Sequence, residues 1–315
     1  MGDGLALVAD IGRQSVRFGI TGGGAGLEPR DVRRFSSDDH PTFTSALVSY
    51  LRDCGLQNEH LPSALAVAGA TRGDLINPTG SRWYISLSGI ESVLRVRPLA
   101  LNECVANALA LVQLPASAYS ALQGMPNKVE VGGNYVVLGA GAGLGVAALI
   151  TSGNRLVPVP SEAGHMTFAA CTADERRFVE YCAAKGLVPD TEMLLSEPGL
   201  LRAYEVLSGG AKLAKPEDVM RAAGRDPVAA AVVQMFVEHL GAYAGDLVLA
   251  YAAWDGVYLT GPLARALHSH IAGPGFHRRM VAKASFRRQL SEVPVSLVTR
   301  TDLELLGAAA ALRNG

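Results

Sequence analysis

Short apolar runs and longer stretches with helical spacing alternate along the first third of the chain. The run 5–9 ends at Asp10, and 16–20 alternates apolar and polar residues after a tight turn. Together they predict a β-hairpin, after which a third strand is expected to reach Phe35. Helical spacing predicts a helix over 42–54. The next expected elements are a strand at 63–69, a hairpin from 75–76 and 82–85, a strand at 98–101 and a helix after it.

An amide and a carboxylate, Asn102 and Glu103, stand where the strand at 98–101 gives way to a helix. Open α/β sheets bind their ligands at the carboxyl ends of strands. A carboxylate there can take a proton from a substrate hydroxyl that an amide orients. The same pair also fits a plain helix start, with Asn102 as N-cap and Glu103 complementing the helix dipole. The local pattern therefore leaves both interpretations open.

The second half of the chain repeats the plan of the first. Strands expected at 134–138 and 146–151 flank the glycine-rich segment 139–145, as the first two strands flank their turn. A duplicated plan predicts two related α/β domains that face each other across a cleft, where ligands tend to bind. The polar segment 125–134 is expected to be a loop between the domains.

The rest of the second half is expected to be mainly helical. A long apolar segment, 227–254, contains Glu238, His239 and Asp246, so it is interpreted as a buried helix and not as a membrane span. The other expected elements are helices near 174–185, 192–195, 200–207, 216–223 and 303–312, and strands at 256–260 and 293–298.

Composition narrows the class of protein. The length of 315 residues predicts two domains or one large lobed domain, and an apolar content of 49% is enough for a sizeable core. The net charge is −1, from 28 basic and 29 acidic residues. This balance gives no reason to expect a nucleic-acid partner. The cysteines form no CxxC pair, and no secretory signal is recognised, so reduced, mostly buried thiols in a soluble cytoplasmic protein are expected. The cysteines are Cys54, Cys104, Cys171 and Cys182.

Three turns have residues suited to a nucleotide. Alternate glycines in 139–145 let backbone N–H groups approach an anion, although the Lys-Ser/Thr ending of a P-loop is missing. In the matching first turn, Asp10 can hold a hydrated Mg²⁺ near phosphates. Gly261 follows a third strand and fits a flat ligand such as adenine. Each turn also has a purely structural interpretation: a tight hairpin, an Asp-capped turn, and a helix start with Pro262 at its first position.

Glu162 and His165 share one polar segment that follows two prolines. A carboxylate and an imidazole together can hydrogen-bond neighbouring hydroxyls of a sugar. They can also be metal ligands, but no third ligand stands at a usable spacing, so no metal site is expected there. Glu192 is a further candidate acceptor of hydrogen bonds from sugar hydroxyls. Its alternative interpretation is a solvated helix residue.

Taken in order, these motifs resemble the bacterial glucokinase family of the actin-like sugar kinases, over nearly the full length. The resemblance implies a two-domain α/β fold of the actin-like (ribonuclease H-like) type with a cleft between the domains. It also implies ATP with Mg²⁺, phosphorylation of the 6-hydroxyl of glucose, and a homodimer. The expected small domain is 1–113 plus 302–315, because the last helix of the family packs back on it, and the large domain is 114–301. The segments that support the likeness are 7–12 with Arg17, 101–103, 139–147, 162–169, 195–204, 259–261 and 305–309.

The resemblance assigns roles residue by residue. Glu103 stands at the position of the catalytic base, and Asp10 at a position that holds Mg²⁺ indirectly. Positions that match the sugar-binding residues are Asn102, Glu162, His165 and Glu192. Positions that match the nucleotide-binding turns are Asp10, Gly12, Arg13, Gln14, Gly139, Gly141, Ala142, Gly143 and, near adenosine, Gly261.

The departures from the family pattern fall on the nucleotide side. Arg13 and Gln14 replace a glycine and a threonine, Ala142 replaces a threonine, Pro262 replaces a glycine, and the base is Glu103 instead of Asp. Two hypotheses follow. The first is a working glucokinase, because a Glu can act as a base and an Arg can stabilise phosphoryl transfer. The second is a hexose-binding sensor or partner protein, inactive or weakly active, with a degraded nucleotide site.

Overall fold

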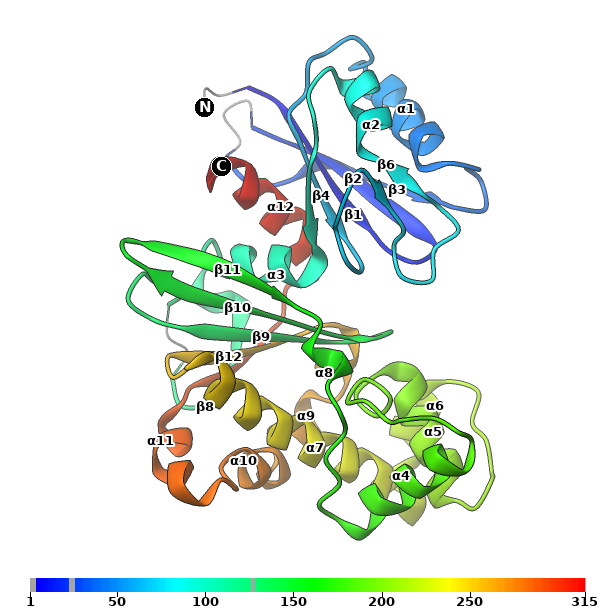
Figure 1. Cartoon of the computed structure of the whole chain (residues 1–315), viewed down its shortest axis with the longest axis vertical. Helices are drawn as coiled ribbons and strands as arrows, with labels where there is room; N and C mark the ends of the chain where they lie inside the picture. The colour runs from blue at the N-terminus through cyan, green and yellow to red at the C-terminus, as the bar shows by residue number, and fades with distance from the viewer. Residues whose placement is uncertain (1–3, 23–25, 126–127, 315) are drawn as a thin grey trace. The chain divides into compact units, whose positions relative to one another are not determined.

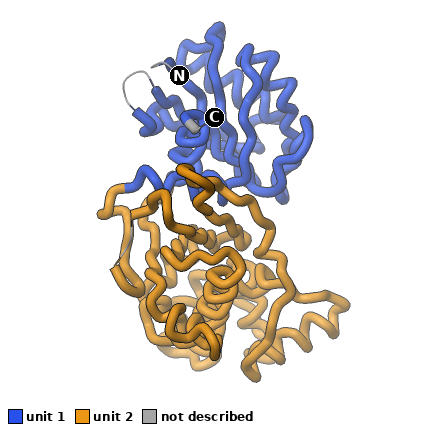
Figure 2. The backbone as a smooth tube through the Cα atoms, turned by 60° about the vertical axis from the view of Figure 1, so that its left-hand side comes forward, with its two compact units in different colours: residues 1–114, 302–315 blue, residues 115–301 orange. Residues whose placement is uncertain are grey.

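The computed structural model of the protein describes residues 4–22, 26–125 and 128–314. The chain divides into two compact units, shown in different colours in Figure 2. Unit 1 comprises residues 1–114 and 302–315, and unit 2 comprises 115–301. The boundary expected from the sequence, between 113 and 114, lies one residue away. The C-terminal helix belongs to unit 1, although it is far from the rest of that unit in sequence.

Unit 1 contains a five-stranded sheet with the order β3-β2-β1-β4-β7. β1 to β4 are labelled in Figure 1. The predicted hairpin and third strand are confirmed, since β1, β2 and β3 pair antiparallel. β4 and β7 run parallel to β1, so the carboxyl ends of β1, β4 and β7 meet at one edge. The strands are β1 (Ala6–Ile11), β2 (Ser15–Thr21), β3 (Arg30–Ser36), β4 (Ser63–Val67) and β7 (Leu99–Asn102).

The helices of unit 1 are α1 (Phe43–Asp53), α2 (Leu87–Leu94), α3 (Glu103–Leu111) and α12 (Leu303–Asn314). The predicted small hairpin is also present, as β5 (Leu75–Ile76) with β6 (Ile85–Ser86). α2 was not predicted, because its Ser and Gly are weak helix formers. It forms because Ser86 caps it, accepting the N–H of Gly89, and because Ile90 and Leu94 are fully buried.

The sheet of unit 2 repeats this plan, with the order β11-β10-β9-β12-β13-β8. β9, β10 and β11 pair antiparallel, and β12 runs parallel to β9, as β4 does to β1. β11 was not predicted because it contains Pro158 and Pro160, which an edge strand tolerates. The strands are β8 (Tyr119–Gln123), β9 (Tyr135–Ala140), β10 (Leu144–Ser152), β11 (Arg155–Ser161), β12 (Gly256–Thr260) and β13 (Val295–Val298). Of the loop predicted at 125–134, residues 126 and 127 lie outside the described part of the chain.

The long apolar segment forms α7 (Pro227–Tyr251), and most of it is buried inside unit 2, as predicted. Among the described residues it is the one helix long and apolar enough to cross a membrane by length and composition. The helix predicted at 192–195 is wrong: these residues form turns, because the helix starts only after Ser196, which caps it. The other helices are α4 (Ala173–Ala184), α5 (Glu197–Leu207), α6 (Pro216–Ala222), α8 (Pro262–Ala266), α9 (His268–Ile271), α10 (Pro274–Met280) and α11 (Arg287–Glu292), with single turns η1 (Ala116–Ala118), η2 (Ala163–His165) and η3 (Ala284–Phe286).

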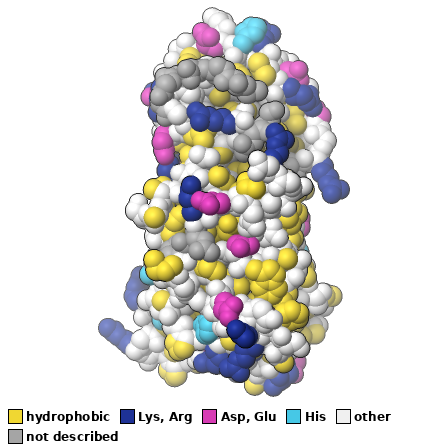
Figure 3. Space-filling view, turned by 90° about the vertical axis from the view of Figure 1, so that its left-hand side faces the viewer, with side chains coloured by type: hydrophobic (Ala, Val, Ile, Leu, Met, Phe, Trp, Pro, Cys, Tyr) yellow, Lys and Arg dark blue, Asp and Glu magenta, His cyan; other side chains and the backbone are white. Residues whose placement is uncertain are grey.

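The surface of the protein carries charged side chains of both signs. On the face drawn in Figure 3, basic and acidic side chains are interspersed, with a group of basic ones at the lower end. The basic residues of α10, α11 and the segment between them are largely neutralised by ion pairs within unit 2: Arg278–Glu238, Arg279–Glu175, Lys283–Asp246 and Arg288–Glu292.

All the cysteines are free, but only Cys104 and Cys182 are buried. The expectation of mostly buried thiols is therefore wrong for Cys171, which is exposed in the segment before α4.

Candidate functional site

The candidate residues of unit 1 lie along the edge of the sheet where its parallel strands end. Ile11 pairs with Val67, and Val67 pairs with Asn102, so these residues end three neighbouring strands. Adjacent strands are about 4.8 Å apart, which places the turn after β1 about 10 Å from Asn102. This edge is where open α/β sheets bind ligands.

Asn102 has a well-defined structural role. Its Oδ1 accepts the N–H of Cys104 at 2.8 Å, and its Nδ2 donates to the carbonyl of Gly69 at 3.1 Å. The N-cap interpretation is therefore confirmed. The two bonds also fix the orientation of the amide and use one of its two N–H groups. The remaining N–H can donate to a ligand, so the structural and the binding interpretation are compatible.

Glu103 is the first residue of α3 and is half-buried. The helix behind it is held closely, because α12 crosses α3 at Gly307. A Cβ placed on Gly307 would lie 1.7 Å from the carbonyl oxygen of Ala106, so only glycine permits this approach. The backbone that carries Glu103 is thus anchored by the C-terminal helix.

Asp10, at the end of β1, is paired with Arg17 and Glu304. Nε of Arg17 donates to Oδ2 of Asp10 at 2.8 Å, and its Nη2 donates to Oε2 of Glu304 at 3.1 Å. Burial raises the pKa of both carboxyl groups, against the attraction of the guanidinium, and the charge of Asp10 further raises the pKa of Glu304. Two acids thus share one base.

A magnesium ion fits this arrangement only in an indirect role. Nε and Nη2 of Arg17 each lie 2.8 Å from Oδ2 of Asp10, so a water coordinated to the ion would be placed on Oδ1. Among the described residues, no group of three or more His, Cys, Asp or Glu side chains is arranged to hold a metal ion. This donor set suits a hydrated Mg²⁺ that arrives with phosphates, since Mg²⁺ keeps several waters and uses few carboxylates.

The turn after β1 is open. The N–H of Gly12 donates to the carbonyl of Ser15 at 3.0 Å, and a Cβ on Gly12 would lie 3.7 Å from that oxygen, an ordinary contact. Arg13 and Gln14 are exposed. The side chain of Arg13 passes over Gly80, where an added Cβ would lie 2.7 Å from its Nε. Arg13 therefore rests against another loop of its own unit.

The matching turn of unit 2, between β9 and β10, is tightly packed. The N–H of Gly141 donates to the carbonyl of Gly143 at 2.9 Å, and the N–H of Leu144 donates to Oε2 of Glu192 at 2.8 Å. A Cβ on Gly143 would lie 2.7 Å from the same Oε2. The glycine-rich turn and Glu192 are therefore in direct contact, with Ala142 exposed and Gly139 half-buried.

Gly261, after β12, joins the same part of unit 2. Its φ of +92° favours glycine, and a Cβ there would lie 2.2 Å from the carbonyl oxygen of Ala140. α8 begins at Pro262, so the predicted helix start is confirmed. The ring of Pro262 lies against Gly141, where an added Cβ would be 3.0 Å from its Cδ. The adenosine candidate thus borders the glycine-rich turn.

Glu162, His165 and Glu192 are brought together in unit 2. The carbonyl of Glu162 accepts the N–H of His165 at 3.0 Å in the single turn η2, and the carbonyl of Gly164 accepts the N–H of Glu192 at 2.9 Å. Glu162 and His165 are exposed and Glu192 is half-buried, so all three have surface available to a ligand. Two carboxylates and one imidazole are thus brought together, a set of side chains that can hydrogen-bond the hydroxyls of a sugar.

Asp190 belongs to this group, although it was not recognised in the sequence. Its Oδ2 lies 2.9 Å from Nδ1 of His165. This hydrogen bond raises the pKa of His165, against the effect of partial burial, and Glu192 and Glu162 add to the rise. The only available signal in the sequence was an acid two residues before Glu192.

The segment behind these residues is supported by α7. The hydroxyl of Tyr243 donates to the carbonyl of Ala163, and the ring of His239 stacks on Phe168 with centroids 4.1 Å apart. Burial raises the pKa of Glu175, but hydrogen bonds from His239 and from two backbone N–H groups lower it to about 2. Glu175 is thus a buried carboxylate, and it accepts a hydrogen bond at 3.0 Å from the His239 ring that stacks on Phe168.

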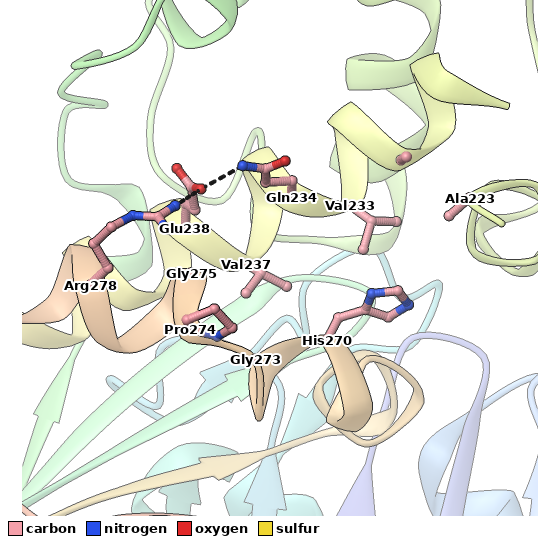
Figure 4. A pocket seen from close by; sticks show the side chains of 11 residues that line it. Ala223, Val233, Gln234, Val237, Glu238, His270, Gly273, Pro274, Gly275 and Arg278 are labelled. Atoms are coloured by element: carbon pink, nitrogen blue, oxygen red, sulfur yellow. Dashed lines mark hydrogen bonds and ion pairs between the residues drawn. The ribbon is translucent and has the colours of Figure 1, made fainter.

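A separate cavity of about 310 Å³ lies between α7, α9 and α10 (Figure 4). At one end, Nε2 of Gln234 donates to Oε1 of Glu238 at 2.8 Å, and Arg278 pairs with the same carboxylate. None of the candidate site residues lines it. Its charged groups satisfy one another, and it has no role in the proposed chemistry.

Comparisons with known proteins agree with the geometry. The family model for glucokinase matches residues 7–315. The chain belongs to the glucokinase family. A glucokinase of Xanthomonas campestris is 34% identical over 96% of this chain and 93% of its own length. The crystal structure of a glucokinase from an Antarctic psychrotroph has a TM-score of 0.86, 27% identity and complete coverage of both chains.

More distant structures share the fold. A glucokinase from Balamuthia mandrillaris, solved in complex with glucose, has a TM-score of 0.83 at 17% identity, covering 99% of this chain and 94% of that one. The predicted family and the two-domain actin-like α/β fold are confirmed by these findings. The roles of individual residues remain predictions.

Proposed function

We propose that this member of the glucokinase family transfers the terminal phosphoryl group of ATP to the 6-hydroxyl of glucose, with Glu103 as general base. The observation that best supports the proposal is the contact of Glu192 with the glycine-rich turn. One carboxylate accepts the N–H of Leu144 at 2.8 Å and stands beside Glu162 and His165. A sugar-binding group and a candidate phosphate-binding turn are thereby linked through one side chain.

Each residue has a distinct task in this proposal. Glu162, His165 and Glu192 hydrogen-bond the sugar hydroxyls, and the free N–H of Asn102 orients the reacting 6-hydroxyl. Glu103 accepts the proton of that hydroxyl as the hydroxyl oxygen attacks the terminal phosphorus of ATP, and the bond from that phosphorus to the bridging oxygen breaks so that ADP leaves. Backbone N–H groups of the two turns hold the phosphates, and the backbone at Gly261 borders adenosine.

Magnesium, carried by ATP, would neutralise charge on the phosphates, with Asp10 holding a coordinated water. The phosphate-binding positions in the proposal are Gly12, Arg13, Gln14, Gly139, Gly141, Ala142 and Gly143. A homodimer and a cytoplasmic location complete the proposal on the strength of the family likeness, with neither nucleic acid nor membrane as a partner. Light scattering after size-exclusion chromatography tests the dimer.

The decisive variant is Glu103→Gln, which keeps the size of the side chain and removes the base. We expect kcat to fall by about 10²–10⁴-fold, the usual contribution of a general base, while the KM for glucose changes little. Formation of glucose 6-phosphate is measured in a coupled assay. Glu91→Gln, an exposed carboxylate of unit 1 paired with Arg97, is the matched control. Full turnover by Glu103→Gln would show that Glu103 is not the general base.

The second candidate function is a hexose-binding sensor without kinase activity. Bulky residues at the nucleotide side favour it: Pro262 lies against Gly141, and the exposed Arg13 stands in the turn after β1. Calorimetry with glucose alone and with a non-hydrolysable ATP analogue and Mg²⁺ alone separates the two functions. Binding of both ligands supports the kinase. Sugar binding without measurable nucleotide binding contradicts it.

A further inference from the structure

Two segments of unit 2 are joined into a short ribbon that carries the sugar-binding group. The N–H of Phe168 donates to the carbonyl of Pro189 at 3.1 Å, and the N–H of Thr191 donates to the carbonyl of Met166 at 2.9 Å. Thr167 and Asp190 form an antiparallel bridge between these bonds. The ribbon fixes the backbone of Asp190 opposite the segment that begins with His165.

The carboxylate of Asp190 is held on both sides. Its Oδ2 contacts Nδ1 of His165 at 2.9 Å, and its Oδ1 accepts the N–H of Met193 at 2.9 Å. Its side chain is 27% exposed, compared with 53% for that of His165. Asp190 is therefore oriented toward the imidazole, and the imidazole, which is more exposed, is the group available to a ligand.

We propose that Asp190 is a positioning residue for glucose binding, which fixes the ring orientation and the tautomer of His165. The inference rests on the proposed function, in which His165 hydrogen-bonds the sugar. With Nδ1–H donating to Asp190, the neutral ring presents the lone pair of Nε2 as an acceptor for a sugar hydroxyl. Without this carboxylate, the proton can move to Nε2 and the ring can rotate.

The charges around the ring are consistent with this role. Asp190, Glu192 and Glu162 all face His165 and favour its protonated form, and partial burial opposes them. Asp190 has the largest effect of the three on the pKa of His165. Its removal should lower that pKa, so the acid limb of kcat/KM for glucose should move to lower pH.

The test compares Asp190→Asn with Asp226→Asn in the complete protein. Asp226 is a matched control because its carboxylate also accepts a backbone N–H in unit 2, outside the candidate site. As the N-cap of α7 it accepts the N–H of Val228 and the hydroxyl of Tyr204, at 2.8 Å each. We expect Asp190→Asn to raise the KM for glucose about tenfold, the effect of losing a charge-assisted hydrogen bond, with kcat changed less than about twofold. Asp226→Asn should change neither constant.

Nitrogen-15 NMR of histidine-labelled protein reads the tautomer directly. The signal of His165 is identified by its absence in His165→Gln, and in the unsubstituted protein the proton is expected on Nδ1. This measurement needs no variant of Asp190, so it tests the proposal even if Asp190→Asn fails to fold. A proton on Nε2 would overturn it, and so would an Asp190→Asn variant with the original glucose KM and pH profile.

The outcomes also separate this inference from the proposed function. If the unsubstituted protein binds no glucose in calorimetry, the proposed function fails. If it binds glucose and only the Asp190 variant behaves like the Asp226 control, the proposed function stands and the positioning role of Asp190 is wrong.

Discussion

The two units repeat one strand plan but surround its first turn differently. In unit 1, the turn after β1 is open, and a Cβ on Gly12 would meet nothing closer than 3.7 Å. In unit 2, a Cβ on Gly143 would lie 2.7 Å from Glu192. The open turn tolerates Arg13 and Gln14, whereas the packed turn keeps its glycines. Two turns with the same topology can therefore have different sequences, because contacts with residues distant in the chain determine which side chains fit in each turn.

The buried charges of the two units differ in the same way. Unit 1 has two acids, Asp10 and Glu304, around one base, and burial raises the pKa of both. In unit 2, one acid, Glu175, accepts hydrogen bonds from His239 and Arg279, and its pKa is lowered to about 2. The balance of partners determines whether a buried carboxylate prefers its proton. Acidification should therefore affect the two networks in opposite directions.

The largest expected effect is that of Glu175→Gln. It leaves His239 and Arg279 without a buried anion, and breaking such a network costs about 3 kcal/mol of the free energy of unfolding. Because the folded-state pKa of Glu175 is depressed, its stabilisation is present above the unfolded value near 4.5 and is lost as pH falls toward about 2. Urea unfolding from pH 7 to pH 3 measures this.

Glu180→Gln, at an exposed position of α4, is the control for Glu175. Hydrogen exchange in α4 and α7 localises the loss to unit 2. Equal stability of Glu175→Gln and Glu180→Gln would show that the buried network of unit 2 contributes nothing, and the contrast between the units would disappear.

The next effect concerns the two turns. Gly143→Ala places a Cβ 2.7 Å from Oε2 of Glu192, so the carboxylate must move. We expect glucose affinity, measured by calorimetry without nucleotide, to fall by about tenfold to a hundredfold, since losing a hydrogen bond to a charged group costs about 1.5–3 kcal/mol. Gly12→Ala, in the open turn, should leave glucose affinity unchanged. Similar losses in both variants would contradict the distinction between a packed and an open turn.

The smallest expected effect is a gain in the stability of the fold. Glu304→Gln relieves the excess of acids in unit 1 and should raise the free energy of unfolding by about 1 kcal/mol at pH 7, within the range found when buried charges are replaced by neutral groups. Because the folded-state pKa of Glu304 is raised, its carboxyl group destabilises the fold as pH rises through that value, and the gain should vanish at low pH, where Glu304 is protonated. Urea titrations at pH 7 and at low pH measure the free energy of unfolding of Glu304→Gln and of the unsubstituted protein. A gain in stability that persists at low pH would contradict this explanation.

Much of the fold was predictable because apolar periodicity is a local property. The hairpins after β1 and β9, the strand before Asn102 and the buried α7 all follow from it. Elements whose stability depends on a cap or an edge position were missed, as α2 and β11 demonstrate. The turn at 192–195 was mistaken for a helix because the cap at Ser196 was not recognised.

By itself, the sequence determined the family, the two-unit α/β plan and the residue types available to a sugar and a nucleotide. Only the tertiary structure decided which of these residues meet. Glu304 reaches Arg17 across 287 positions, and Asp190 reaches His165 across 25. Hydrogen bonds and pKa shifts depend on distance in space and on burial, and the order of residues along a chain contains neither quantity directly.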